Sequence, residues 1–242
     1  MAILKWKEPL FKAHMIISCI KKNILFVCLI CSFAAFSQND FTTFFEPLFA
    51  VNHKVNDSYK VNFATVSRNY VYRDSEFEFT TRQLQFVHFS TLSFNSNHSV
   101  SAGVMYRFRE NFEDKSNELR FTQQYNYAHR PNIVRFGHRF RTEQRITTNN
   151  TVHRFRYRFT IDLPLSGEKL DVGEPYFVAN TESLLSVVKA STPQLDQRFT
   201  TQIGWLWTKS LKFQTGLEYR FENYNQDTKE ILFILTSVIL KL

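Results

Sequence analysis

Polar and apolar side chains alternate along four successive runs between residues 99 and 163, and arginine dominates the polar set. In one run, Phe155, Tyr157 and Phe159 alternate with Arg154 and Arg156. Successive side chains of a strand point to opposite faces, so this alternation predicts strands with one polar and one apolar face. Four such strands in a row, with charge on one face and aromatic rings on the other, are typical of a closed barrel in a membrane.

The alternation extends beyond this region and predicts eleven candidate strands. Most are long enough to cross a bilayer as tilted strands, which takes about 9 to 11 residues. The links between them alternate between short turns and longer polar loops, and the long link from Pro164 to Glu174 breaks that order. The candidate strands cover residues 41–52, 58–70, 80–94, 99–110, 117–128, 133–145, 151–163, 175–187, 195–208, 211–222 and 230–242.

The number of strands is the open point of this prediction. Bacterial single-chain barrels have an even number of strands, so a count of eleven indicates that one segment is missed, merged or not a strand. The segment 41–52 is the weakest, because Pro47 is tolerated only at a sheet edge or a bulge. We therefore expect an all-β fold, an antiparallel up-and-down transmembrane β-barrel of 10 to 12 strands, with ten and twelve both open.

The N-terminal segment predicts export. Lys21 and Lys22 precede an apolar run from Ile24 to Phe36, and small residues stand at Ala35 and Ser37. This pattern is typical of a cleaved secretory signal peptide, and the apolar run is shorter than the roughly 20 residues of a membrane-spanning helix. We expect residues 1–37 to be the signal peptide, with a true start at Met15 as an alternative. Residues 38–242 would then form a single barrel domain in the outer membrane.

Cysteine positions and charge exclude several classes of function. Cys19, Cys28 and Cys31 all precede the expected cleavage site, so no disulfide would hold the mature fold, and we expect no metal site. The net charge of +8 falls to +4 after cleavage, because the leader contributes five lysines against Glu8. This balance argues against nucleic acid as a partner.

The polar face predicts a basic lumen. Arginine guanidinium groups could pair with carboxylates and fill a narrow interior, which is a structural role, or they could line a path for anions. We favour the structural role, because long side chains can fill a barrel of this size. The candidate lumen charge network consists of Arg107, Arg109, Glu118, Arg120, Arg135, Arg139, Arg141, Glu143, Arg154, Arg156, Arg158, Asp162, Glu182, Arg198, Glu218 and Arg220.

Several short motifs occur in a characteristic order along the mature chain. They are RFRTEQR at 139–145, RFRYRF at 154–159 followed by Leu163-Pro164-Leu165, the pair Asn180 and Glu182, the pair Gln197 and Arg198, and GLEYRF at 216–221. With its leader, the chain resembles the uncharacterised bacterial outer-membrane family catalogued as domain of unknown function 2490. It departs from the family where Phe44 and Phe45 replace a tryptophan that commonly begins the first strand. The resemblance implies an outer-membrane β-barrel and offers no catalytic residues to carry over.

Two other classes of function remain open. A lipid-modifying enzyme of the outer membrane could use His138 and His153, which lie on neighbouring candidate strands near Thr142. A secreted lipocalin-like barrel would instead turn its apolar face inward to bind a small apolar ligand. We expect no enzyme activity and no cofactor. The expected partners are membrane lipid and, for the final strand 230–242, the machinery that assembles barrels during biogenesis.

Overall fold

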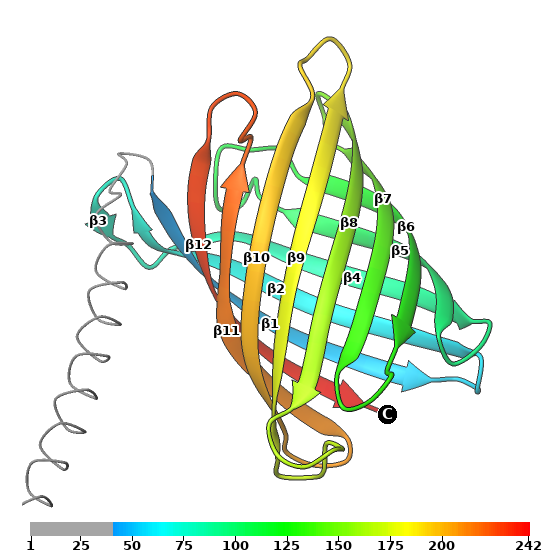
Figure 1. Cartoon of the computed structure of the whole chain (residues 1–242). Coiled ribbons are helices and arrows are strands. Elements are labelled where there is room, and N and C mark those ends of the chain that lie inside the picture. The colour runs from blue at the N-terminus through cyan, green and yellow to red at the C-terminus, as the bar shows by residue number, and fades with distance from the viewer. Residues whose placement is uncertain (1–40) are drawn as a thin grey trace, which may run out of the picture. The chain divides into compact units, whose positions relative to one another are not determined.

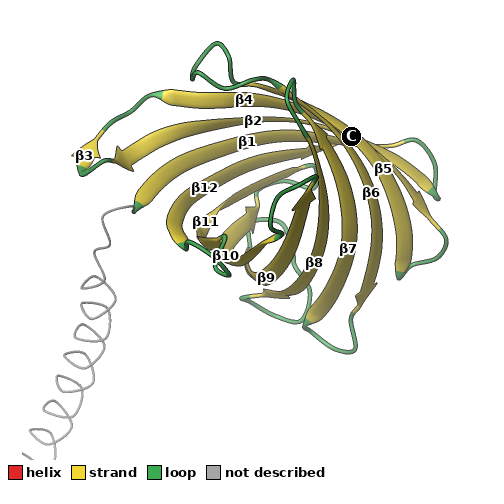
Figure 2. Ribbon diagram, turned by 90° about the horizontal axis from the view of Figure 1, so that it is seen from above, coloured by secondary structure: helices red, strands yellow, loops and turns green. Residues whose placement is uncertain are grey.

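The computed structural model describes residues 41–242 as one β-sheet that closes on itself (Figures 1 and 2). The expected signal peptide 1–37, its cleavage before Gln38 and the three cysteines lie outside the described residues. Within residues 41–242, no helix has the length and apolar character needed to cross a membrane.

The described part of the chain confirms the all-β prediction. Each of the eleven candidate segments contains a long strand, and a further strand of two residues, β3 (Glu76–Phe77), pairs with the end of β2. The wall consists of β1 (Thr42–Lys54), β2 (Tyr59–Arg73), β4 (Thr81–Ser93), β5 (His98–Phe108), β6 (Glu118–His129), β7 (Arg135–Ile146), β8 (Thr151–Pro164), β9 (Pro175–Val188), β10 (Gln194–Leu206), β11 (Leu211–Glu222) and β12 (Lys229–Lys241).

The expectation of an even strand number, ten or twelve, is wrong for the barrel formed by residues 41–242. Its wall has eleven strands, and β1 closes it by pairing antiparallel with β2 and parallel with β12. An odd number of strands joined by simple turns leaves the first and last strands pointing the same way. Their parallel ladder still satisfies the backbone groups of both edges, so the sheet has no open edge.

Pro47 does not remove β1 from the sheet. The ladder between β1 and β2 passes from the pair Phe45 and Asn69 to the pair Leu48 and Val66, so Pro47 has no partner residue on β2. On its other side, Pro47 lies opposite Thr236 of β12. A proline lacks the N–H that a ladder needs, and this interruption in pairing is where a strand tolerates it.

The two mouths of the barrel differ in their links. We call the mouth where β1 and β12 both end the C-terminal mouth; residues 55–58, 94–97, 130–134, 165–174 and 207–210 form its links. Residues 165–174 are the long link that broke the predicted order, and they lie among the short turns. The opposite mouth has the links 74–80, 109–117, 147–150, 189–193 and 223–228.

Apolar side chains lie on the outside of the wall and most charged side chains on the inside. Val104 and Phe121 keep 37% and 43% of their surface exposed, and Phe136 stacks on Phe159 elsewhere on the outer face. Inside, Phe89 lies over Gly103, where an added Cβ would come within 2.4 Å of its ring. The orientation of the two faces is therefore the one expected for a barrel with a polar lumen.

Candidate functional site

Three glutamates lie on the inner face with almost no exposed surface. Glu118 on β6, Glu143 on β7 and Glu182 on β9 each retain 1% of their surface, and all three occupy the inward positions of their strands. A carboxylate removed from water this completely is tolerated only when cations and hydrogen bonds compensate for its lost hydration. Arginines supply that compensation in each case.

Glu118 lies at the centre of the first arginine cluster. Arg145 of β7 holds both carboxylate oxygens in a forked contact, with N···O distances of 3.0 and 2.7 Å. Arg120 contacts the same carboxylate at 2.6 Å. Arg107 of β5 lies at 3.2 Å and Arg109, the first residue after β5, at 3.3 Å. Two parallel charge-assisted bonds fix direction as well as distance, so Arg145 also sets the orientation of the carboxylate.

Glu182 lies at the centre of a second cluster, which joins four strands. Arg158 of β8 holds it with a fork of 3.0 and 3.2 Å, and Arg156 contacts it at 2.5 Å. Arg139 of β7 lies at 2.8 Å and Arg198 of β10 at 3.9 Å. Contacts from strands on both sides tie this part of the wall together.

Glu143 links the two clusters into one network. Arg120 contacts Glu118 and also Glu143, at 3.5 Å, and Arg156 contacts Glu143 at 2.7 Å as well as Glu182. Nine arginines lie within 4 Å of these three glutamates, so the interior carries a large excess of positive charge. We call this set the arginine network.

Aromatic rings and arginines also occupy the interior of the barrel along β1, β2, β11 and β12. Phe233 of β12 is fully buried, with the guanidinium carbon of Arg220 3.6 Å and that of Arg68 4.7 Å from its ring centroid. Arg68 pairs with Glu46 of β1 at 2.6 Å, and Arg220 pairs with Glu218 at 2.5 Å. Cation–π contacts of this kind strengthen when the pair is desolvated. Side chains thus line the inner wall from β6 round to β1.

The loop 109–117 supplies a further contact at the opposite mouth. Its Glu113 accepts a hydrogen bond from the Tyr70 hydroxyl and pairs with Arg82 at 3.4 Å and Lys115 at 3.2 Å. Burial alone would raise the pKa of Glu113, but the Tyr70 hydrogen bond and the charges of Arg82 and Lys115 outweigh it and lower that pKa. The carboxylate therefore stays ionised at neutral pH and ties the loop to β2 and β4.

Other predicted residues lie outside the arginine network. Arg135 pairs with Asp162 at 2.8 Å at the C-terminal mouth, where the Arg135 side chain is half exposed. Arg154 donates to Ser186 at 2.8 Å and lies 3.9 Å from Asp196. These contacts are local and do not link the glutamate clusters.

Sequence reasoning missed several contributors. Arg145 continues the inward alternation of β7 and could have been included on that signal alone. Glu46 was not predicted as an inward residue, because the neighbouring Pro47 made the strand 41–52 uncertain. Glu113 lies in a loop and carries no periodic signal, so only the folded chain brings it to Tyr70.

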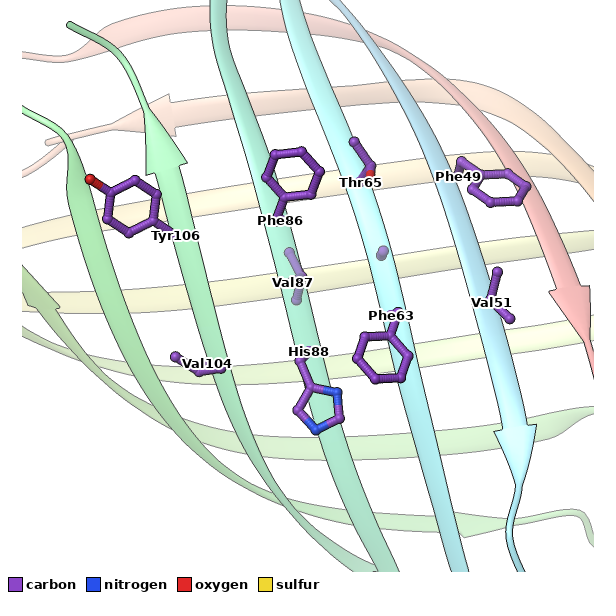
Figure 3. A pocket seen from close by; sticks show the side chains of 10 residues that line it. Phe49, Val51, Phe63, Thr65, Phe86, Val87, His88, Val104 and Tyr106 are labelled. Carbon is purple, nitrogen blue, oxygen red and sulfur yellow. The ribbon is translucent and has the colours of Figure 1, made fainter.

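An apolar pocket of about 360 Å³ lies on the outer face across β1, β2, β4 and β5 (Figure 3). Phe49, Phe63 and Phe86 line it together with His88, whose imidazole lies 4.5 Å from the ring of Phe63. The Nε2 atom of His88 lies 3.2 Å from the Ser90 hydroxyl oxygen. A histidine is thus hydrogen-bonded to a serine beside an apolar cavity.

The two histidines proposed for an enzyme lie elsewhere on the outer face and do not form a site with Thr142. Nδ1 of His138 lies 2.9 Å from the Tyr157 hydroxyl, and Thr142 donates to Gln123. His153 lies opposite Gln144 in the β7–β8 ladder. No group of three or more histidine, cysteine, aspartate or glutamate residues within 41–242 is arranged to hold a metal ion.

Comparison with known proteins identifies one family. The model described as protein of unknown function (DUF2490) matches residues 48–230, which include the three buried glutamates and most of the wall. No curated protein and no solved structure matches the chain.

Proposed function

We propose that this chain, which belongs to the DUF2490 family of proteins of unknown function, is a β-barrel of the outer membrane whose lumen is closed by its arginine network. The observation that carries the proposal is the division between the two faces of the wall. Phe199 and Leu217 lie half exposed at the middle of outer strand faces, while Glu118, Glu143 and Glu182 are buried inside. An apolar exterior with a polar interior suits a barrel surrounded by lipid.

The same division argues against the lipocalin-like alternative. A soluble barrel that binds an apolar ligand turns its apolar face inward and its charged face to water. Here Arg107, Arg120 and Arg198 are buried inside, and large aromatic side chains are left outside. Membrane lipid is accordingly the partner we propose for the outer face, and the barrel assembly machinery is the partner we propose during biogenesis.

A structural role for the arginine network is favoured over an anion path. The guanidinium groups of Arg145 and Arg158 are held in forks by carboxylates, and Arg156 spans two glutamates at 2.7 and 2.5 Å. A permeating anion would have to compete with these carboxylates for the guanidinium groups. Conduction also needs sites that bind an ion weakly enough to release it, and arginines already held by carboxylates do not provide such sites. Long side chains fixed this tightly fill a small barrel and brace its wall.

Replacing Arg141 and Arg156 with glutamine tests this role. We expect a lower unfolding temperature, because Glu143 and Glu182 lose cations that compensate for their burial. Ion conductance in planar bilayers should stay near zero in both the wild type and the double variant. A stable, open, anion-selective conductance in the wild-type protein, lost in the variant, would establish the anion path instead.

Recovery of the mature protein in the soluble fraction without detergent would overturn the membrane location.

One observation favours a lipid-modifying enzyme as a second candidate function. Ser90 lies within hydrogen-bonding distance of His88 Nε2, at 3.2 Å, and of the Tyr59 hydroxyl, at 3.0 Å. A serine becomes nucleophilic when a neighbouring imidazole accepts its proton. In such a reaction the Ser90 oxygen would attack an ester carbonyl, His88 would pass the proton to the departing alcohol, and water would then hydrolyse the acyl-serine. The apolar pocket beside His88 suits an acyl chain.

Ester hydrolysis by the full chain in detergent tests this second candidate. With phospholipid or a p-nitrophenyl acyl ester as substrate, Ser90→Ala and His88→Ala should each lower the rate by about a thousandfold or more. Ser183→Ala is the matched control, because Ser183 is another outward serine, hydrogen-bonded to Gln197. No hydrolysis by the wild type, or equal rates for Ser90→Ala and Ser183→Ala, would rule the enzyme out.

A further inference from the structure

At the C-terminal mouth lies an open cavity of about 670 Å³. The turns 55–58 and 207–210 contribute to its rim, and Thr160 and Val178 lie at its inner end. Two positions beyond Thr160 on β8 is Arg158, which is fixed to Glu182 in the arginine network. The cavity is therefore a vestibule that ends at that network, and its volume lies in the range of small-molecule sites.

The vestibule lining is strongly basic. Seven lysines and arginines line it, against only two acidic residues, Asp57 and Asp162. Both acids are already paired, Asp57 with Lys54 at 2.6 Å and Asp162 with Arg135 at 2.8 Å. For the other five cations, no carboxylate of residues 41–242 lies within 4 Å. These five are Lys60, Arg130, Lys209, Lys212 and Lys241.

Lys212 is the cation best placed to hold a ligand. It occupies an inward position of β11, is only partly exposed, and its ammonium lies 5.5 Å from the ring centroid of Tyr176. Three charged groups act on that ammonium: Arg135 and Lys241 carry like charge and act unfavourably, while Asp162 acts favourably. The excess positive charge of the arginine network adds to the same field. Converging cations of this kind concentrate anions in a cleft.

We propose that the vestibule binds a small, soluble anion with several negative charges carried on phosphate groups. Lysine ammonium groups act as point charges toward phosphate, and arginine can hold two phosphate oxygens at once. A ligand with several charges matches five unpaired cations better than a single carboxylate does. Because the cavity ends at fixed ion pairs, the anion binds and leaves by the same mouth. The site depends on the barrel wall and not on whether lipid surrounds it.

Calorimetric titration of the full chain in neutral detergent with inorganic pyrophosphate tests the site. We expect saturable binding that weakens as salt rises, because exposed charges are screened. The double variant Lys212→Gln, Lys241→Gln should bind more weakly, by about tenfold for each lysine removed. The matched control is Lys189→Gln, Lys229→Gln, which removes the same charge from exposed positions at the opposite mouth. The control should bind as the wild type does.

A second titration with dispersed phosphatidic acid distinguishes a soluble phosphate from a lipid headgroup. Binding of pyrophosphate that depends on Lys212 and Lys241 supports the soluble solute. Binding of phosphatidic acid alone, with the same dependence, overturns the soluble solute and assigns the site to a lipid phosphate. The site itself is overturned if neither probe binds. It is also overturned if the vestibule double variant and the control double variant lose the same amount of binding affinity. A difference in gel mobility with and without boiling confirms that each variant is folded.

Discussion

Glu182→Ala is expected to destabilise the barrel by about 3 to 5 kcal/mol. The substitution leaves Arg139, Arg156, Arg158 and Arg198 without the carboxylate that they share, inside a wall where Glu182 itself is 1% exposed. Uncompensated buried charge costs far more than the net contribution of the original pairs. Denaturant unfolding of the detergent-solubilised protein, followed by the fluorescence of Trp205 and Trp207, measures the change.

An exposed ion pair provides the control for this experiment. Lys54 and Asp57 lie 2.6 Å apart at the C-terminal mouth with most of their side-chain surface in solvent. Because water screens such a pair, Asp57→Asn should leave the unfolding curve unchanged. Equal curves for Glu182→Ala and the wild type would show that the arginine network does not stabilise the wall, and the structural role proposed for it would fail.

Leu217→Arg is the substitution that best separates a barrel in lipid from a barrel in water. Leu217 lies near the middle of β11 on the outer face with half of its surface exposed. If that face meets the bilayer midplane, an arginine there should destabilise the fold by about 2 to 4 kcal/mol. In water, the same exchange at an exposed position should change stability by no more than about 0.5 kcal/mol. Unfolding of the protein in lipid vesicles gives the value.

Ile146→Arg is the matched comparison, because Ile146 faces outward at the last residue of β7, beside a turn. Near the membrane–water interface, an arginine should lower the free energy of unfolding by only about 0 to 1 kcal/mol. Leu217→Ala separates the loss of the leucine side chain from the gain of charge. If Leu217→Arg and Ile146→Arg are equally mild in vesicles, the outer face does not contact a hydrocarbon core and the membrane proposal is wrong.

Local pattern was enough to predict the strands and their two faces. Along β8, Arg154, Arg156 and Arg158 alternate with aromatic residues, and the side-chain period of a strand is two whatever its neighbours are. A shift of one residue would exchange the faces of a whole strand, so the pattern is strongly constrained. The same alternation predicts inward positions for Glu118, Glu143 and Glu182, each of which is 1% exposed.

The local sequence pattern could not predict how the barrel closes or which strands pair at the closure. The parallel pairing of β1 with β12 joins residues almost 190 positions apart, such as Thr42 and Ile231, and depends on the tilt and stagger of every strand between them. That pairing decided the odd strand number. The tolerance of Pro47 also depends on tertiary pairing, because the separate β1–β2 ladder is interrupted there.

The sequence by itself determined that this chain forms strands with an arginine-rich face and an aromatic face, because strand periodicity depends only on neighbouring residues. The tertiary structure alone decided which carboxylate each arginine meets. Arg139 and Arg198, on β7 and β10, share Glu182 of β9 because the closed wall brings three separate strands to one point. It likewise gathered Lys60, Arg130, Lys209, Lys212 and Lys241 around one vestibule. Contacts of this kind depend on distances across a curved sheet, which no local spacing encodes.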